Sequence, residues 1–166
     1  MADLIYNIDS RRLTGRVGGM EIVAYAGSGG RAGSKVAGAE NWWLANNSLA
    51  THVGGNQSQG THTYGPIPRG LYTLTSHESR KNWIRLIPDR SNIMFGRTGF
   101  AIHGSCKTGS HGCLVPTDFN IVLTLGKLVQ SNDRAGGATD HPGGRIDGSG
   151  HRQTVRDRLA HSKSAG

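Results

Sequence analysis

The sequence is poor in cysteine and has no long hydrophobic run. Two cysteines among 166 residues are too few for a disulfide framework. No apolar stretch reaches the roughly 18 residues that a membrane-spanning helix needs, so we expect no membrane span. The opening residues, MADLIYNIDS, lack the basic start and apolar core of a Sec signal peptide. The sequence therefore predicts a protein that is made in the cytoplasm and either stays there or leaves without a cleaved signal.

Acidic residues are also scarce, and the formal net charge is +8 at pH 7. A basic protein favours anionic partners such as nucleic acid, lipid headgroups or cell-wall polymers. The lysines and arginines are scattered, without the dense cluster or the aromatic-basic alternation that is typical of nucleic-acid binding. We therefore expect no nucleic-acid partner.

Glycine, in contrast, is abundant at 26 residues, and hydrophobic residues make up 35% of the chain. Helix-rich folds avoid this much glycine, so the composition predicts a mainly β domain. Apolar alternation predicts an N-terminal hairpin of two strands, residues 3–9 and 19–26, joined by a turn-rich link over 10–18. The glycine-rich segment 27–38 is predicted to be a flexible surface loop. Further strands are expected over residues 71–75, 82–88 and 100–103.

One helix is predicted over residues 115–130, with Thr117 or Asp118 as its N-cap. Apolar residues recur in this segment at the spacing of one helix face, which would pack against the sheet. The residues expected on that buried face are Phe119, Val122, Leu125 and Val129.

The C-terminal part of the chain differs in composition from the rest. Residues 131–166 are rich in Gly, Ser, Asp, Arg and His and contain few apolar side chains. Such a segment buries too little apolar surface to offset the entropy of ordering it. We therefore expect one domain over residues 1–130, followed by a loose tail that can form a short helix near 152–160.

The motif IHGSCKTGSHGC, residues 102–113, concentrates chemically active side chains. It holds two histidines and both cysteines. A reactive cysteine needs a lowered pKa, a nearby base and partial exposure. Cys113 follows a tight Ser-His-Gly turn, and His103 ends a predicted strand, so the loop between them can fold back and bring the imidazole to the sulfur. Successive backbone N–H groups of the turn can form an oxyanion hole.

Three other interpretations of this motif stay open. The two histidines and two cysteines could bind zinc, although their spacing differs from common zinc modules. Cys106 and Cys113 could form a disulfide, which would close a small loop and add little stability. Cys113 could instead be a small buried hydrophobic residue beside structural histidines. The alternative function is thus a non-enzymatic cell-wall-binding or zinc-stabilised module.

The motif resembles the hallmark of the L,D-transpeptidase (YkuD-type) family, in which a strand ends in His-Gly and a short loop leads to Ser-His-Gly-Cys. Here the two parts are IHG at 102–104 and SHGC at 110–113. Upstream, IPRGLYTL at 67–74 is similar to the family's proline-glycine turn and strand. The resemblance covers roughly residues 3–130. It implies an L,D-transpeptidase-like β-sandwich or barrel-like domain with one or two short helices.

The resemblance also implies a cysteine enzyme that acts on peptidoglycan stem peptides without a metal or cofactor. Cys113 would be the nucleophile and His103 the general base, while His111 would help to orient the sulfur. Ser110 would shape the turn, and Gly112 would offer its N–H to the oxyanion. The implied activity is L,D-carboxypeptidase cleavage of the diaminopimelate–D-Ala bond in tetrapeptide stems, or L,D-transpeptidase exchange of the terminal D-amino acid.

Two features depart from most members of the family. The loop within the motif is short, and Val115 stands where an arginine usually helps to hold a substrate carboxylate. We expect Arg97, Lys107 and Tyr64 to bind substrate instead. With the absent signal peptide, the short loop makes the chain similar to small L,D-transpeptidase-like toxins delivered by type VI secretion. That similarity implies secretion, action in the periplasm of a target cell, and a cognate immunity protein.

Overall fold

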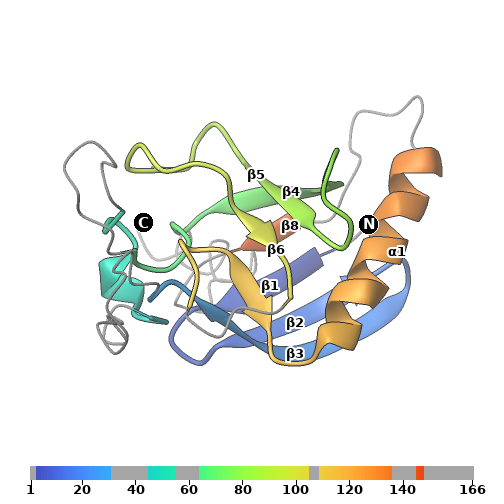
Figure 1. The fold of residues 1–166 in the computed structure, drawn as a ribbon, viewed down its shortest axis with the longest axis horizontal. Helices are drawn as coiled ribbons and strands as arrows, with labels where there is room; N and C mark the ends of the chain where they lie inside the picture. Colours follow the sequence, from blue (N-terminus) through green and yellow to red (C-terminus); the bar gives the residue numbers. More distant parts are fainter. Residues whose placement is uncertain (1–2, 31–44, 55–63, 105–108, 136–144, 148–166) are drawn as a thin grey trace, which may run out of the picture.

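The described part of the chain forms a β-barrel with an α-helix packed against it (Figure 1). The computed structural model describes residues 3–30, 45–54, 64–104, 109–135 and 145–147. Within these residues, the strands close the barrel in the order β1-β2-β3-β7-β6-β5-β4-β8. The prediction of a mainly β domain is therefore confirmed.

The N-terminal part forms an antiparallel meander of three strands. These are β1 (Asp3–Asn7), β2 (Arg12–Val17) and β3 (Met20–Ser28). The predicted two-stranded hairpin is wrong, because its supposed turn-rich link contains β2. Leu13 and Val17 are fully buried, but Gly15 stands between them where a third inward side chain would be. The glycine interrupts the apolar alternation by which a strand is recognised.

The other wall of the barrel contains four short strands. These are β4 (Leu71–Ser76), β5 (Ile84–Pro88), β6 (Ala101–Ile102) and β7 (Leu114–Pro116). In β5, Ile84 and Leu86 are buried while Arg85 and Ile87 are exposed, as the alternation predicts. β6 and β7 run parallel to each other. Their pairing brings the two ends of the 102–113 motif together.

The helix α1 (Phe119–Ala135) packs against β2, β4, β5 and β7. The predicted start at residue 115 is wrong, because residues 114–116 pair with β3 as strand β7. Asp118 is the N-cap, and its side chain accepts a hydrogen bond from Asn120 N at 2.9 Å. Phe119 is 47% exposed, contrary to its predicted burial. The other residues of the predicted face are fully buried: Val122, Leu125 and Val129.

A strand from beyond the predicted domain boundary completes the barrel. β8 (Arg145–Asp147) pairs in parallel with β1 and antiparallel with β4. Residue 130, where we placed the boundary, lies inside α1. The C-terminal segment therefore contributes backbone to the barrel, and the helix expected near 152–160 lies outside the described residues.

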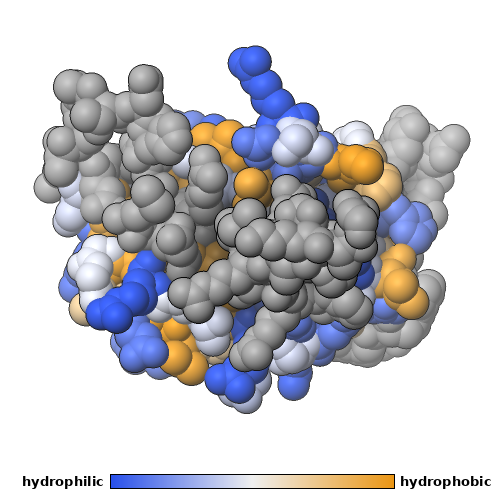
Figure 2. Space-filling view, turned by 180° about the vertical axis from the view of Figure 1, so that it is seen from behind, coloured by the Kyte–Doolittle hydropathy of each residue, from blue (hydrophilic) through white to orange (hydrophobic). Residues whose placement is uncertain are grey.

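The barrel interior is a single apolar cluster to which α1 contributes Leu125 and Val129. Its largest fully buried side chains include two tyrosines, Tyr6 and Tyr72. Full burial of a Leu or Ile side chain in this cluster stabilises the fold by roughly 1.5–3 kcal/mol. On the outer surface, Figure 2 shows apolar residues in small groups among hydrophilic ones. No helix in the described ranges is long and apolar enough to cross a membrane.

Candidate active site

The β6–β7 pair places His103 and Cys113 on one face of the sheet. Ile102 pairs with Leu114, and His103 N donates to Leu114 O at 3.1 Å. Both of these apolar side chains fill the barrel core. Successive side chains alternate across a strand, so the residue after Ile102 and the residue before Leu114 both point to the opposite face. His103 is 6% and Cys113 is 8% exposed.

Ser110 holds the turn that leads to Cys113. Its Oγ accepts hydrogen bonds from Gly29 N at 3.0 Å and Gly112 N at 3.3 Å, and donates to Cys113 O at 2.7 Å. Ser110 N also donates to Gly29 O at 3.1 Å. This 3%-exposed side chain therefore fixes the turn to the end of β3. The Gly112 N–H, which the sequence suggests as an oxyanion donor, points to Ser110 in this structure.

Replacing Ser110 with Ala is expected to lower the free energy of unfolding by about 1–3 kcal/mol, because buried N–H groups lose their acceptor. Urea denaturation measures this change. Ser131→Ala is the matched control, since it removes an exposed hydroxyl that donates to Lys127 O in its own helix. The control should change stability by less than about 0.5 kcal/mol. Equal effects of the two substitutions would show that Ser110 does not hold the turn.

Ser28 forms the wall behind the turn. It is 2% exposed, and its Oγ donates to Gly112 O at 2.8 Å and accepts from Ile67 N at 2.9 Å. The side chain thus joins three segments that are far apart in sequence. The flexible-loop prediction is wrong for residues 27–30, which end β3 and lie behind the turn. The rest of that predicted loop lies outside the described residues.

The His103 ring is positioned by Trp83. The two rings stack with centroids 4.1 Å apart and planes 10° apart. Nδ1 of His103 lies 3.2 Å from Gly104 O. A carbonyl oxygen can only accept a hydrogen bond, so this contact favours the tautomer that carries its proton on Nδ1. The lone pair on Nε2 is then the basic site of the neutral ring.

Arg97 lies buried beside the turn rather than on an open binding surface. Its Nη1 donates to Thr51 O at 2.5 Å and Pro66 O at 2.6 Å. Its Nη2 donates to Gly65 O at 2.9 Å and His111 O at 3.0 Å. With 7% exposure and four carbonyl acceptors, the guanidinium is not placed to hold a substrate carboxylate. It instead ties the turn to two other segments of the chain.

The positive charge of Arg97 acts on the sulfur. Burial lowers the pKa of Arg97 to about 10, so the guanidinium remains charged at neutral pH. Negative charge on Tyr72, Cys113 or Tyr64 raises the pKa of Arg97, and the effect of Tyr72 is the largest of the three. Because the interaction is mutual, a thiolate at Cys113 is stabilised by the buried cation.

His111 lies at the surface of the motif, over Tyr64. The two rings stack with centroids 4.0 Å apart and planes 29° apart. Tyr64 is 7% exposed, and the His111 imidazole is exposed beside the turn. Tyr64 therefore supports His111 and has little surface of its own to offer a substrate. Cys106 and Lys107 lie outside the described residues.

Cys113 carries a buried thiol. In the part of the chain that the structure describes, no three His, Cys, Asp or Glu side chains gather where they could hold a metal ion. The zinc and disulfide interpretations both require Cys106, which is not described, so they stay untested.

Sequence reasoning missed two residues that shape the site, Ser28 and Trp83. The register of β5 against β6 pairs Ile84 with Ile102, and this sets Trp83 opposite His103. Such cross-strand neighbours pack together, but their pairing is visible only after the strands are aligned. In the sequence, Trp83 is visible only as one residue of the strand expected over 82–88.

Neither a family model nor a curated protein sequence matches this chain. Among solved structures, the chain is similar to the one described as "Structure of Bdellovibrio bacteriovorus Bd1075", with 14% sequence identity and a TM-score of 0.47. The similarity covers 98% of this chain and 54% of the other, so this chain spans about half the length of that protein.

Proposed function

We propose that this protein is a cysteine enzyme of peptidoglycan stem peptides, acting as an L,D-carboxypeptidase, an L,D-transpeptidase or both. The observation that carries the proposal is the convergence of His103 and Cys113 on one face of the β6–β7 pair. Ser110 fixes the turn between them, and Arg97 supplies a buried positive charge. The resemblance of the motif to that of L,D-transpeptidases supports the choice of substrate.

In the first half-reaction, Nε2 of His103 takes the thiol proton of Cys113. The thiolate attacks the carbonyl carbon at the L-centre of diaminopimelate and forms a tetrahedral intermediate. The bond from this carbon to the D-Ala nitrogen then breaks, and the imidazolium gives its proton to the leaving amine. The products are free D-Ala and a thioester on Cys113.

In the second half-reaction, a nucleophile resolves the thioester. Water attacks the thioester carbonyl while His103 takes its proton, and the proton then passes to the departing sulfur. This hydrolysis releases a tripeptide stem and restores the thiol. The amine of a D-amino acid can attack instead, which gives exchange. The same nitrogen serves as base and then as acid in both cases.

The proposed setting is the periplasm of a target cell, where stem peptides are found. The net charge of +8 favours association with anionic cell-wall polymers. The similarity to small L,D-transpeptidase-like toxins supports delivery by type VI secretion. A producing cell would then need an immunity protein to protect its own wall.

Incubating the reduced protein with purified disaccharide-tetrapeptide muropeptides is expected to release D-Ala, because the thioester forms only when that bond breaks. Mass spectrometry measures the loss of one alanine residue from the stem. Adding a second D-amino acid distinguishes hydrolysis from exchange, since exchange incorporates the added residue at the same position. Intact muropeptide after long incubation with folded, reduced protein would overturn the enzyme proposal and favour a wall-binding module.

A further inference from the structure

A cavity lies beside the proposed base, between the β4–β5 turn and α1. Its volume is about 440 Å³. Trp83 lines this cavity and also stacks on the His103 ring. The cavity is therefore separated from the proposed base by one aromatic side chain. Its walls are residues 76–84 on one side and Leu123, Gly126, Lys127, Val129 and Gln130 of α1 on the other.

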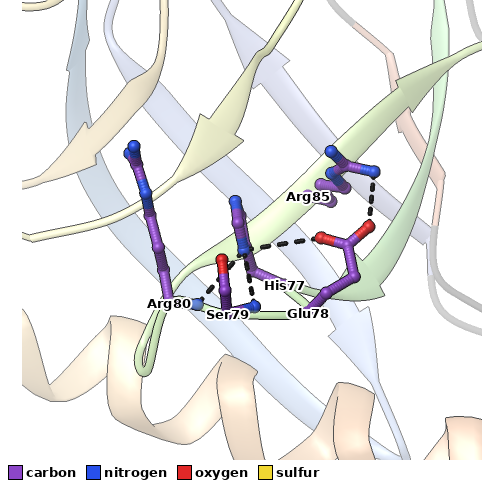
Figure 3. A network of polar contacts seen from close by, with 5 residues as sticks. All are labelled: His77, Glu78, Ser79, Arg80 and Arg85. Carbon is purple, nitrogen blue, oxygen red and sulfur yellow. Dashed lines mark hydrogen bonds and ion pairs between the residues drawn. The ribbon is translucent and has the colours of Figure 1, made fainter.

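The β4–β5 turn has a defined shape, which His77 maintains (Figure 3). The Nδ1 atom of His77 accepts hydrogen bonds from Ser79 N and Arg80 N, each at 3.2 Å. His77 N donates to Trp83 O at 3.2 Å, which closes the turn. Asn82 adopts a left-handed backbone conformation with φ of 60° just before Trp83. Arg80 and Trp83 therefore stand at fixed places in the cavity wall.

The cavity carries an excess of positive charge. Arg80, Lys81 and Lys127 all line it. Among the described residues of the lining, Glu78 alone is acidic, and its carboxylate pairs with Arg85 at 2.6 Å. Figure 3 shows Arg80 extending away from this ion pair. Among the described residues, none of the three cations forms an ion pair, so the cavity favours an anionic occupant.

The geometry of Arg80 suits a carboxylate. Its guanidinium carbon lies 4.4 Å from the centre of the Trp83 ring. A guanidinium that stacks on an aromatic face keeps its N–H donors in its own plane, where a carboxylate can bind two of them. Trp83 in turn contacts the His103 ring at 4.1 Å. Arg80 and the proposed base therefore contact the same indole ring, which places a carboxylate bound to Arg80 close to the proposed reacting groups.

We propose that this cavity binds a carboxylate group of the peptide substrate, with Arg80 as its principal ligand and Lys127 on the facing wall. The inference rests on the proposed function. Most L,D-transpeptidases hold a substrate carboxylate with an arginine shortly after the cysteine, and this sequence has Val115 there. Arg80 would take that role. It also replaces Arg97 in that role, since the Arg97 guanidinium is occupied by four backbone carbonyls.

The test is the affinity of the disaccharide-tetrapeptide muropeptide for the full chain carrying Cys113→Ala, measured by titration calorimetry. Adding Arg80→Gln is expected to raise Kd about tenfold, the effect of losing a charge-assisted hydrogen bond. Arg90→Gln is the matched control, because it removes the same charge from an exposed arginine outside the cavity. The control should change Kd by less than about twofold.

When the peptide carboxylates are amidated, the Arg80→Gln and Arg90→Gln proteins should bind the muropeptide with the same Kd. Lys127→Gln tests the contribution of the α1 wall to binding, and it provides a second variant if the Arg80→Gln protein does not fold. Its expected rise in Kd is about threefold, because lysine binds a carboxylate through a single point charge.

These experiments distinguish failure of the carboxylate-binding inference from failure of the proposed enzyme activity. Equal affinities of the Arg80→Gln and Arg90→Gln proteins would overturn the cavity inference, even if the wild type releases D-Ala. Arg80-dependent binding without any D-Ala release would support the cavity and overturn the enzyme proposal. Absence of muropeptide binding to the Cys113→Ala protein would overturn the cavity inference outright.

Discussion

Replacing Cys113 with Ala is expected to abolish the release of D-Ala from tetrapeptide stems and to leave the fold intact. The sulfur is the atom that forms the thioester, so the rate should fall by at least about 10⁴-fold, to the background of the assay. The thiol is small and its contact with Gly99 O is long, at 3.9 Å, so the substitution should cost about 1 kcal/mol of stability. Muropeptide mass spectrometry measures the activity, and thermal unfolding measures the stability.

His103→Gln is the companion variant, since glutamine keeps a planar polar group beside Trp83 but cannot accept and return a proton. We expect kcat/KM to fall by about 10²- to 10⁴-fold, the range for losing a general base. Cys113→Ser keeps a similar shape with a much weaker nucleophile and should also be nearly inactive. Unchanged D-Ala release by the Cys113→Ala protein would contradict the assignment of the nucleophile.

The proposed catalytic pair could be found from the sequence because both residues belong to one short motif. The spacing between His103 and Cys113 is local, and the strand before the first residue is visible in the apolar pattern. The buried positions of β5 and most of the buried face of α1 follow from periodicity in the same way. These features depend on neighbours along the chain, which a single sequence displays.

The surroundings of the pair depend on contacts between distant segments and could not be predicted. Arg97 binds carbonyl groups from three parts of the chain, and nothing in the sequence marks one arginine among many as buried. The Trp83–His103 stack requires the register of β5 against β6. β8 was missed because three residues in a glycine-rich segment carry no apolar alternation.

The glycines of the 27–38 segment misled the sequence interpretation, because Gly29 lies where two segments pack closely together. A Cβ atom at Gly29 would lie 2.5 Å from the carbonyl carbon of Gly65, and the residue has φ of +80°. A Cβ atom at Gly112 would lie 2.5 Å from Nη2 of Arg97, with φ of +106°. Gly29 packs against the backbone of another segment and Gly112 against the Arg97 and Phe100 side chains, so both positions require glycine for close packing rather than for mobility. A glycine-rich pattern alone does not distinguish these two causes.

Arg97→Met is expected to lower the free energy of unfolding by about 3–5 kcal/mol, the largest stability effect that we predict. Methionine fills similar space but donates no hydrogen bond. The carbonyl oxygens of Thr51, Gly65, Pro66 and His111 would lose the donor that the guanidinium supplies. Each buried acceptor left without a partner costs about 1–3 kcal/mol, with partial relief from relaxation. Urea denaturation measures the loss.

Arg97→Lys separates the structural role of this residue from its electrostatic role. Lysine keeps the charge near Cys113, but its compact ammonium cannot reach four carbonyls, so stability should fall by about 1–3 kcal/mol. The alkylation rate of Cys113 at neutral pH, resolved by peptide mass spectrometry, reports the thiolate. This alkylation rate should fall in the Arg97→Met protein and be largely retained in the Arg97→Lys protein, because a nearby positive charge stabilises the thiolate and the four hydrogen bonds do not. Equal alkylation rates in the two proteins would mean that Arg97 supports the turn without activating the sulfur.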